Sequence, residues 1–235
     1  MKYLAIGNNA KTIKSDKGGE YLTAIMYLRP NLRVCAMSEL AQCIEACLNT
    51  AGRGAMNSIQ TARQRKTDAF EADPVAFVDQ LKADTLKALK KATKKGVKLA
   101  VRMNGTSDIA WENIAGSNGN TIFEDFPDVQ FYDYTKLPGR KVPANYHLTV
   151  SYSGANAKYA LKVLDSRHNI AVVFRDKDSI PAFFNGRPVI DGDRDDLRFL
   201  DPKGVVVALY AKGKAKKDTT GFVVDMAPEL IAVAS

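Results

Sequence analysis

The sequence predicts an α/β protein whose single domain is built around a partial or irregular (β/α) barrel. Short apolar segments recur along the chain, and several of them end in polar or glycine-rich residues. Strands that are buried on both faces and carry chemistry at their carboxyl ends have this pattern. Segments of helical periodicity separate some of these strands, but other connections are too short for a full helix. We therefore expect an incomplete barrel.

The expected elements follow in chain order. Residues 1–20 form a basic arm or loop, residues 21–213 form the barrel core, and residues 214–235 form a C-terminal segment. In the second helix Asp73 is an N-cap and Gly96 lies where a C-terminal cap belongs. Strands are expected at 21–30, 98–103, 129–136, 146–154, 170–175, 188–193 and 204–213, and helices at 56–70, 73–95 and 155–166.

The chain is basic. Its 235 residues include 34 Lys and Arg against 26 Asp and Glu, which gives a formal net charge of +8. Such a balance favours polyanionic partners, so nucleic acid is an expected partner, and a merely solvated surface is the alternative. The lysines of residues 90–98 fit a solvated helix face or a phosphate contact. The candidate nucleic-acid contacts are Lys11, Lys14, Lys17, Lys212, Lys214, Lys216 and Lys217.

Membrane insertion is not expected. The sequence has no apolar run of the roughly 18 residues that a membrane-spanning helix needs. Its first residues have neither the apolar core nor the small-residue cleavage site of a signal peptide. We therefore expect a cytoplasmic protein.

Three cysteines lie in one short stretch after the first expected strand, and their odd number argues against paired disulfides. Seven residues separate Cys35 from Cys43, and three separate Cys43 from Cys47. Soft thiolates suit an iron–sulfur cluster or zinc. Burial on one face of an amphipathic helix is the third interpretation. Neither His147 nor His168 is near in sequence to supply a fourth ligand, which favours a [4Fe–4S] cluster with one open iron.

The layout resembles that of radical S-adenosylmethionine enzymes, in which three cysteines follow the first strand of a partial βα barrel. The resemblance implies a cluster held by Cys35, Cys43 and Cys47, with S-adenosylmethionine on the open iron through its amino and carboxylate groups. The cysteine spacing in this chain is wider than in those enzymes. The resemblance also implies a cofactor-binding segment after the second main strand, formed by Asn104, Gly105, Thr106, Ser107 and Asp108.

Longer phrases carry a second resemblance, which extends over nearly the whole chain. They are GNNAKTIKSDKGG, CLNTAGRG, NGTSDIAWE, FYDYTKLP, NYHLTVS and VIDGDRDDLRFLDPKGVV. Together they are similar to the phage gene product eighty-eight domain family. This resemblance implies a phage or prophage origin and a bacterial host cytoplasm, and it implies no mechanism.

Three polar residues at strand ends are the candidate catalytic groups: Asp133, Lys136 and His147. A lysine there can serve as a base, a Schiff-base residue or a phosphate contact, and an exposed loop lysine or a structural histidine is the alternative. Asp108 and Glu112 follow another strand end, where a carboxylate binds a ligand amine or a metal. A helix N-cap is the alternative for Asp108.

An acidic run offers oxygen ligands for Mg²⁺ or Ca²⁺, although it does not follow the EF-hand pattern. Ion pairing with Arg194 and Arg198 within a turn is the alternative. The run comprises Asp191, Asp193, Asp195 and Asp196.

Two function hypotheses follow. The first is an iron–sulfur enzyme of the radical S-adenosylmethionine type that acts on a nucleic acid, nucleotide or protein target. The second is a basic nucleic-acid-binding protein on a barrel scaffold, without a cluster. The sequence contains neither a GxxxxGK[ST] phosphate loop nor a GxSxG nucleophile motif, which argues against those enzyme classes.

Overall fold

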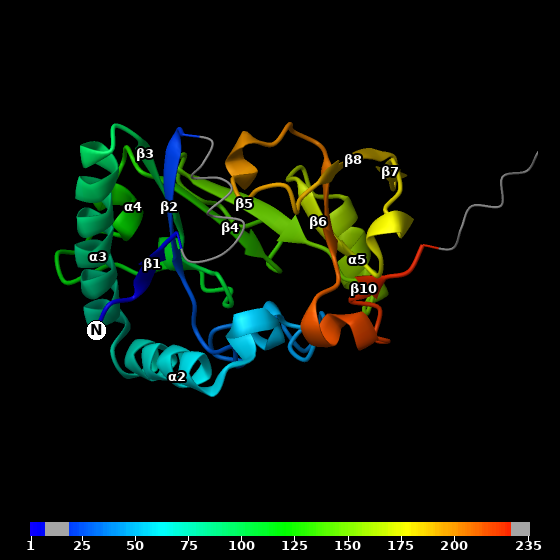
Figure 1. Ribbon diagram of the computed structural model, residues 1–235, viewed down its shortest axis with the longest axis horizontal. Coiled ribbons are helices and arrows are strands. Elements are labelled where there is room, and N and C mark those ends of the chain that lie inside the picture. Colours follow the sequence, from blue (N-terminus) through cyan, green and yellow to red (C-terminus); the bar gives the residue numbers. More distant parts are fainter. Residues whose placement is uncertain (8–18, 227–235) are drawn as a thin grey trace, which may run out of the picture.

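The computed structural model describes residues 1–7 and 19–226, and the predicted α/β class is confirmed (Figure 1). Its strands form a single ten-stranded sheet that does not close on itself, in the order β1-β2-β3-β4-β5-β6-β9-β8-β7, with β10 paired to β6. The candidate contacts Lys11, Lys14 and Lys17 lie outside the described residues.

The central strands of the sheet are all parallel. They are β2 (Tyr21–Met26), β3 (Lys98–Arg102), β4 (Gln130–Thr135), β5 (Tyr146–Ser151), β6 (Ile170–Phe174), β9 (Val206–Tyr210) and β8 (Arg187–Asp191). Each lies within a segment where the sequence predicts a strand, except that β8 begins one residue earlier. The short strands β1 (Leu4–Ile6) and β7 (Phe183–Phe184) run antiparallel to β2 and β8, and β10 (Val223–Val224) pairs in parallel with β6.

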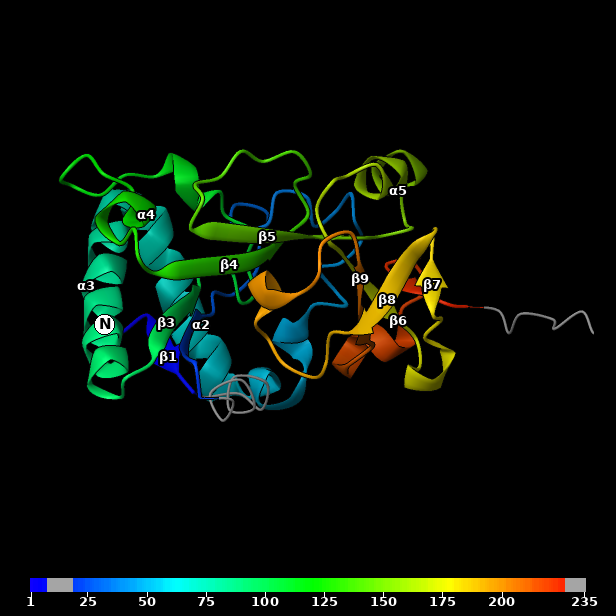
Figure 2. The ribbon, with the colours of Figure 1, turned by 90° about the horizontal axis from the view of Figure 1, so that it is seen from above.

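Helices connect some of the parallel strands. The long β2–β3 connection contains α2 (Asn57–Ala72) and α3 (Pro74–Lys94), and the β5–β6 connection contains α5 (Ala157–Leu164). These three helices confirm the helical periodicity in the sequence. Between β3 and β4 lies the short α4 (Ile122–Asp125), which the sequence analysis did not predict. No helix joins β4 to β5, as their short spacing implied. Figure 2 shows α2 and α3 at the end of the molecule that contains β1–β3, and the β7–β8 hairpin at the other end.

Six short 3-10 helices lie among the described residues. They are η1 (Leu48–Thr50), η2 (Gly52–Ala55), η3 (Trp111–Asn113), η4 (Lys177–Ser179), η5 (Arg198–Leu200) and η6 (Gly213–Lys217). The stretch that contains the three cysteines forms turns and no α-helix. The expected helix at Cys43 and Cys47 is therefore wrong, but Cys35 and Cys43 do pack against buried hydrophobic clusters, as the core interpretation expects. Short-range turn hydrogen bonds, such as the one from the Cys43 N–H to the Ser38 carbonyl (3.0 Å), hold this segment instead.

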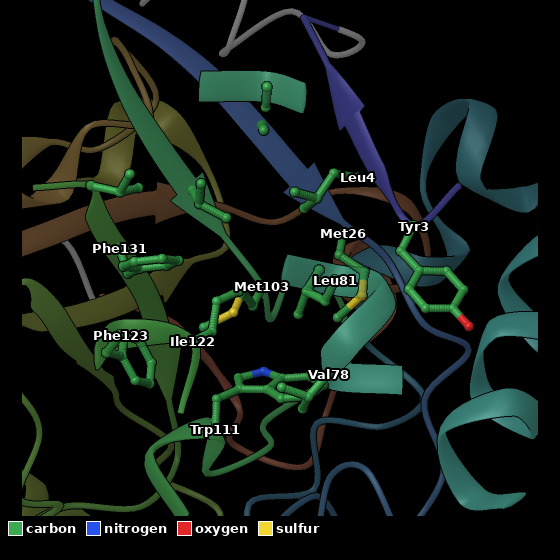
Figure 3. Packing of buried hydrophobic residues seen from close by; sticks show 14 of the residues in the cluster. Tyr3, Leu4, Met26, Val78, Leu81, Met103, Trp111, Ile122, Phe123 and Phe131 are labelled. Carbon is green, nitrogen blue, oxygen red and sulfur yellow. The ribbon is translucent and has the colours of Figure 1, made fainter. Parts of the chain in front are cut away.

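The main hydrophobic core lies between α3 and the adjacent strands, and we call this side of the sheet the α3 face (Figure 3). Its aromatic centre includes Trp111, which is 1% exposed, and Phe77. The Phe77 ring stacks on Tyr3 with centroids 4.1 Å apart and contacts Trp111 at 6.0 Å. Aromatic pairs of this kind each contribute roughly 0.5–1.5 kcal/mol beyond the burial of apolar area. This packing fixes the first part of the sheet against α3.

No helix among residues 1–7 and 19–226 combines the length and the apolar character required to cross a membrane.

We expect Asp73→Ala to lower the free energy of unfolding by about 1 kcal/mol, because the Asp73 side chain accepts a hydrogen bond from the Ala76 N–H at the start of α3 (2.9 Å). Urea unfolding measures the change. Asp128→Ala, at an exposed carboxylate outside a helix, is the matched control and should change stability by less. Equal losses in the two variants would contradict the capping role.

Candidate functional site

The three cysteines lie in the turn segment that follows the carboxyl end of β2. The thiols of Cys43 and Cys47 each raise the pKa of Cys35, and the pKa of Cys47 is raised in turn by Cys43, so the three side chains are within electrostatic reach of one another. Burial is the larger cause of the raised pKa at each thiol. The Cys35 thiol donates to the Thr106 carbonyl (3.9 Å), and the Cys47 sulfur accepts the Asn49 N–H (3.4 Å). None of the three is in a disulfide.

The segment after β3, residues 104–108, lies directly against the chain that leads to the cysteines. The Gly105 N–H donates to the Met26 carbonyl (3.0 Å), and the Asp108 N–H donates to the Val34 carbonyl (2.7 Å). A Cβ on Gly105 would lie 2.5 Å from the Met26 carbonyl oxygen, so only glycine fits this approach. The segment that the sequence predicted to bind a cofactor therefore borders the cysteines.

Asn104 organises the turn from inside. Its side-chain oxygen accepts hydrogen bonds from the Ser107 hydroxyl (2.8 Å), the Ile109 N–H (3.0 Å) and the Trp111 indole N–H (3.0 Å). Its amide nitrogen donates to the Ile109 carbonyl (2.9 Å). The Thr106 hydroxyl donates to the Leu28 carbonyl (2.5 Å). Because these side chains bond within the protein, their first role is to shape the turn, and cofactor binding by this segment stays a prediction.

Asp133, on β4, accepts a hydrogen bond that holds the 104–108 turn in place. The side chain is completely buried on the α3 face, and it accepts the Asn104 N–H (2.8 Å) and the Tyr146 hydroxyl (2.9 Å). Burial raises the pKa of Asp133 to about 7, against the opposing effect of Arg102, whose Nε lies 3.9 Å away. Both carboxylate oxygens are engaged by protein donors, so Asp133 has a positioning role in this structure, and a catalytic role stays a prediction.

Lys136 lies at the carboxyl end of β4, beside the cysteines. The buried amino group donates to the carbonyls of Ser151 (3.3 Å) and Tyr152 (3.2 Å) and to the Ser151 hydroxyl, and it lies over the Phe222 ring. Burial lowers the pKa of Lys136, whereas the neighbouring thiols and Asp108 raise it. Of the three candidate catalytic residues, Lys136 is the one whose charge acts on all three cysteines.

Arg63 of α2 is a second buried cation near Cys47, and the sequence analysis did not single it out. Its guanidinium contacts the carbonyl and side-chain oxygens of Asn49 and lies over the Tyr27 ring (4.9 Å). An isolated arginine in a charged amphipathic helix resembles a surface residue, so no local pattern could have identified it. Two buried cations thus flank the thiols.

Asp108 joins two neighbouring strand ends. Its carboxylate accepts the Lys136 N–H (2.7 Å) and pairs with Arg140 (3.5 Å). Arg140 also binds Glu112 (2.8 Å). The N-cap of η3 is Ala110, and no side chain bonds there. The interpretation of Asp108 as a helix N-cap is therefore wrong, because its carboxylate bonds the β4 end instead.

His147 lies on the opposite face of the sheet, away from the cysteines. It neighbours Tyr132 in register, and its charge interactions are with His168 and Arg198. Burial lowers the pKa of His147 to about 4, so the ring is neutral near pH 7. The structure does not bring Asp133, Lys136 and His147 together as one catalytic group.

Basic residues pair with three of the four aspartates of the acidic run. Asp195 pairs with Arg194 (3.0 Å) and Arg198 (2.9 Å), which confirms the pairing alternative for this residue, and Asp191 accepts the Asp193 N–H (2.8 Å). Asp196 binds Arg102 (3.2 Å) and accepts the Tyr132 hydroxyl (3.1 Å). Within the described ranges, no three His, Cys, Asp or Glu side chains are grouped so that they could hold a metal ion.

The lysines of the C-terminal loop are partly paired. Lys212 contacts Asp193, and Lys214 pairs with Glu45 (3.4 Å). Lys216 and Lys217 are exposed. In the 90–98 stretch the lysines are likewise exposed, as a solvated helix face requires. These positions leave nucleic-acid contact as a prediction.

The fold and the site together define a class: a mixed α/β protein with one open, largely parallel sheet and a cysteine-bearing segment at the carboxyl ends of its strands. The family model for gene product 88 matches residues 3–226, and the chain belongs to this family. The match supports a phage protein, as the resemblance implied. The comparisons with curated proteins and with solved structures found no match.

We expect Gly105→Ala to destabilise the protein by about 1–3 kcal/mol, because the new methyl group would overlap the Met26 carbonyl and the Tyr27 ring. Gly96→Ala is the comparison: Gly96 has φ +68° but open space around it, so only backbone strain of about 1 kcal/mol is expected. Urea unfolding measures both variants. A loss at Gly105 no larger than that at Gly96 would contradict the close approach of β2 and the 104–108 turn.

We expect His147 to make stability fall in acid. The folded-state pKa of about 4 is below the ordinary value of 6.5, so the unfolded chain takes up the proton first. This contribution is complete above pH 6.5 and is lost as the pH falls to about 4, with a slope of at most about 1.4 kcal/mol per pH unit. Urea unfolding at pH 7 and pH 5 should therefore show a smaller acid loss in His147→Gln than in the wild type.

The control for this prediction is His168→Gln. This substitution removes one of the smaller electrostatic effects that lower the pKa of His147. Between pH 7 and pH 5 the variant should therefore lose nearly as much stability as the wild type. An acid loss that is the same in His147→Gln as in the wild type would assign the effect to other groups.

Proposed function

We propose that this protein is an iron–sulfur enzyme of the radical S-adenosylmethionine type on a partial (β/α) barrel, with Cys35, Cys43 and Cys47 as the ligands of a [4Fe–4S] cluster. The observation that supports the proposal is the position of all three cysteines of the chain in the segment that follows β2, with Cys35 against the turn after β3 and Lys136 at the end of β4 near the thiols. Active groups of parallel α/β proteins gather at this edge. The cytoplasm of the phage host is the proposed compartment.

We propose a cluster rather than a single metal ion as the group that the three thiolates would bind. In a [4Fe–4S] cluster each thiolate binds a different iron, so the sulfurs need not approach one shared atom. A zinc ion instead needs four ligands around one centre. Among the described residues no three His, Cys, Asp or Glu side chains are grouped to hold a metal ion, and the three thiols affect one another's pKa. Three thiolates would leave one iron without a protein ligand.

The surrounding charges also suit a cluster. A [4Fe–4S] core with three thiolates is a net anionic group, and burying it requires nearby positive charge. Lys136 acts on all three sulfurs, and Arg63 acts on Cys47. Both cations are buried and held by protein oxygens, so their positions are fixed before any cluster binds.

The neighbouring residues would orient the cofactor. Cys35, Cys43 and Cys47 would hold the cluster, which, with an external one-electron donor, would supply the electron for reductive cleavage of S-adenosylmethionine. The 104–108 turn, which Asp133 and Asn104 hold in place, lies next to Cys35 and would contact the cofactor. Lys136 and Ser151, at the ends of β4 and β5, would border the cofactor on the next side. The proposed target is a nucleic acid, a nucleotide or a protein.

Anaerobic reconstitution with ferrous iron and sulfide tests the proposal. The wild-type protein should gain broad visible absorbance and about four irons and four sulfides per chain. Each of Cys35→Ser, Cys43→Ser and Cys47→Ser should hold much less iron, because a ligand is lost. With dithionite and S-adenosylmethionine, the loaded wild type should release 5′-deoxyadenosine.

Ser38→Ala is the matched control for these variants. Ser38 is a buried residue of the same turn segment, so its replacement tests the integrity of the loop without removing a thiol. This variant should load iron as the wild type does. A wild-type protein that stays colourless, or that binds zinc alone, would contradict the proposal and favour the basic nucleic-acid-binding alternative or a zinc site respectively.

A further inference from the structure

The second half of α3 carries a concentration of positive charge that the candidate site does not use. Between Asp84 and Asp108 the sequence contains no Asp or Glu. The lysines of this stretch are exposed to solvent, and so is Lys2, which precedes β1. Figure 1 shows β1 beside α3. We call the exposed lysines together the lysine surface: Lys2, Lys87, Lys90, Lys91, Lys94, Lys95 and Lys98.

The spacing of the lysines along α3 places them on one face of the helix. Residues three, four and seven apart lie on the same side of an α-helix, and Lys90, Lys91 and Lys94 have these separations from Lys87. Lys2 adjoins them, because it lines a groove between β1 and α3 together with Lys87 and Lys91. Two elements that are far apart in the sequence therefore contribute to a single basic surface.

Carboxylates neutralise little of this charge. Asp84 lines the same groove, but its side chain is buried and accepts the N–H groups of Tyr3 (2.5 Å) and Leu4 (3.4 Å). The contact of Asp84 with Lys87 is long, at 4.0 Å. Among the residues that the structure describes, no ion pair joins another lysine of the surface to a carboxylate. The surface thus keeps a strong positive charge.

The fold does not require most of these lysines. The macrodipole of a helix favours cations only in its last turn, which contains Lys91 and Lys94 but not Lys87 or Lys90. Like charges four residues apart destabilise a helix, and two such pairs are present, Lys87 with Lys91 and Lys90 with Lys94. A charge pattern that the helix tolerates at a cost indicates a binding surface.

We infer that the lysine surface binds the phosphate backbone of a nucleic-acid duplex, independently of base sequence. Such binding needs point charges that displace counterions from phosphates, and lysine supplies them. Lysine is depleted from protein–protein interfaces, which disfavours a protein partner. Neither α3 nor residues 1–2 contain an exposed aromatic ring. Single-stranded nucleic acid is bound largely by stacking on such rings, so a duplex fits better.

This surface is separate from the cysteine site. The last lysines of the surface lie where α3 ends and β3 begins, at the amino ends of the parallel strands. The cysteines follow the carboxyl end of β2, at the opposite edge of the sheet (Figure 1). Duplex binding therefore does not rest on the proposed function. It holds the protein on a nucleic acid without taking part in chemistry at the thiols.

Titration of the metal-free, full-length protein with a short labelled DNA duplex tests the inference, with fluorescence anisotropy at several chloride concentrations to give the Kd. Lys90→Gln/Lys94→Gln should weaken binding at least tenfold near 0.1 M salt and reduce the slope of log K against log salt by about 2. Two phosphate contacts are then lost, whereas glutamine preserves the helix propensity of lysine.

The matched control is Lys158→Gln/Lys162→Gln on α5. Both residues are exposed and four positions apart, so this variant loses the same charge at the same spacing. It should bind the duplex with nearly the wild-type Kd and salt slope. Urea unfolding checks that both variants fold.

Three results would overturn the inference. They are the absence of salt-dependent binding, equal weakening in the two double variants, and tighter binding to single-stranded DNA, polyglutamate or phosphatidylserine vesicles than to the duplex. Because the assay uses metal-free protein, such a failure leaves the cluster proposal intact, and a failure to load iron leaves duplex binding unaffected.

Discussion

The buried carboxylate of Asp133 is the interaction on which the candidate site depends. It connects β4 to the first residue of the 104–108 turn, which follows β3, and to the Tyr146 hydroxyl at the start of β5, so one side chain connects three adjacent strands. Asn104 then sets the turn, and the turn contacts the segment that carries Cys35. An ionisable group at this depth is costly, and its burial raises its pKa to about 7. The cost is offset by donors that come from the elements it holds in place.

Charge is distributed differently over the two sides of the sheet. Beside the cysteines, Lys136 and Arg63 supply positive charge next to groups that carry negative charge once deprotonated. On the opposite face, where η5 packs against β4 and β5, arginines pair with aspartates. Positive charge is therefore left near the thiols, whereas the charges on the opposite face are paired within the protein.

Sequence patterns predicted the framework well, because apolar segments and capping residues act locally. The seven central parallel strands and three helices lie in, or within two residues of, the segments predicted for them, whereas the short β1, β7, β10 and α4 were not predicted. The site was predictable only where its residues cluster in the chain, as the cysteines do. Arg63 and Arg102 reach their partners through the fold, with a separation of 94 residues in the case of Arg102 and Asp196. Asp108 is the clearest example of what the sequence could not predict. An aspartate that caps a helix and one that accepts a backbone N–H from a neighbouring strand end have the same local sequence pattern.

The two ends of the sheet have a consequence for the protein at high concentration. In the described part of the chain the path of strands ends in β1 and β7, which have three and two residues and run against their neighbours. A parallel sheet with long free margins would offer rows of unpaired amides and carbonyls to another molecule. The last strand at each margin is short and antiparallel, so it offers few free backbone groups to which an incoming strand could bind. The protein can thus keep an unclosed sheet without becoming a template for fibres.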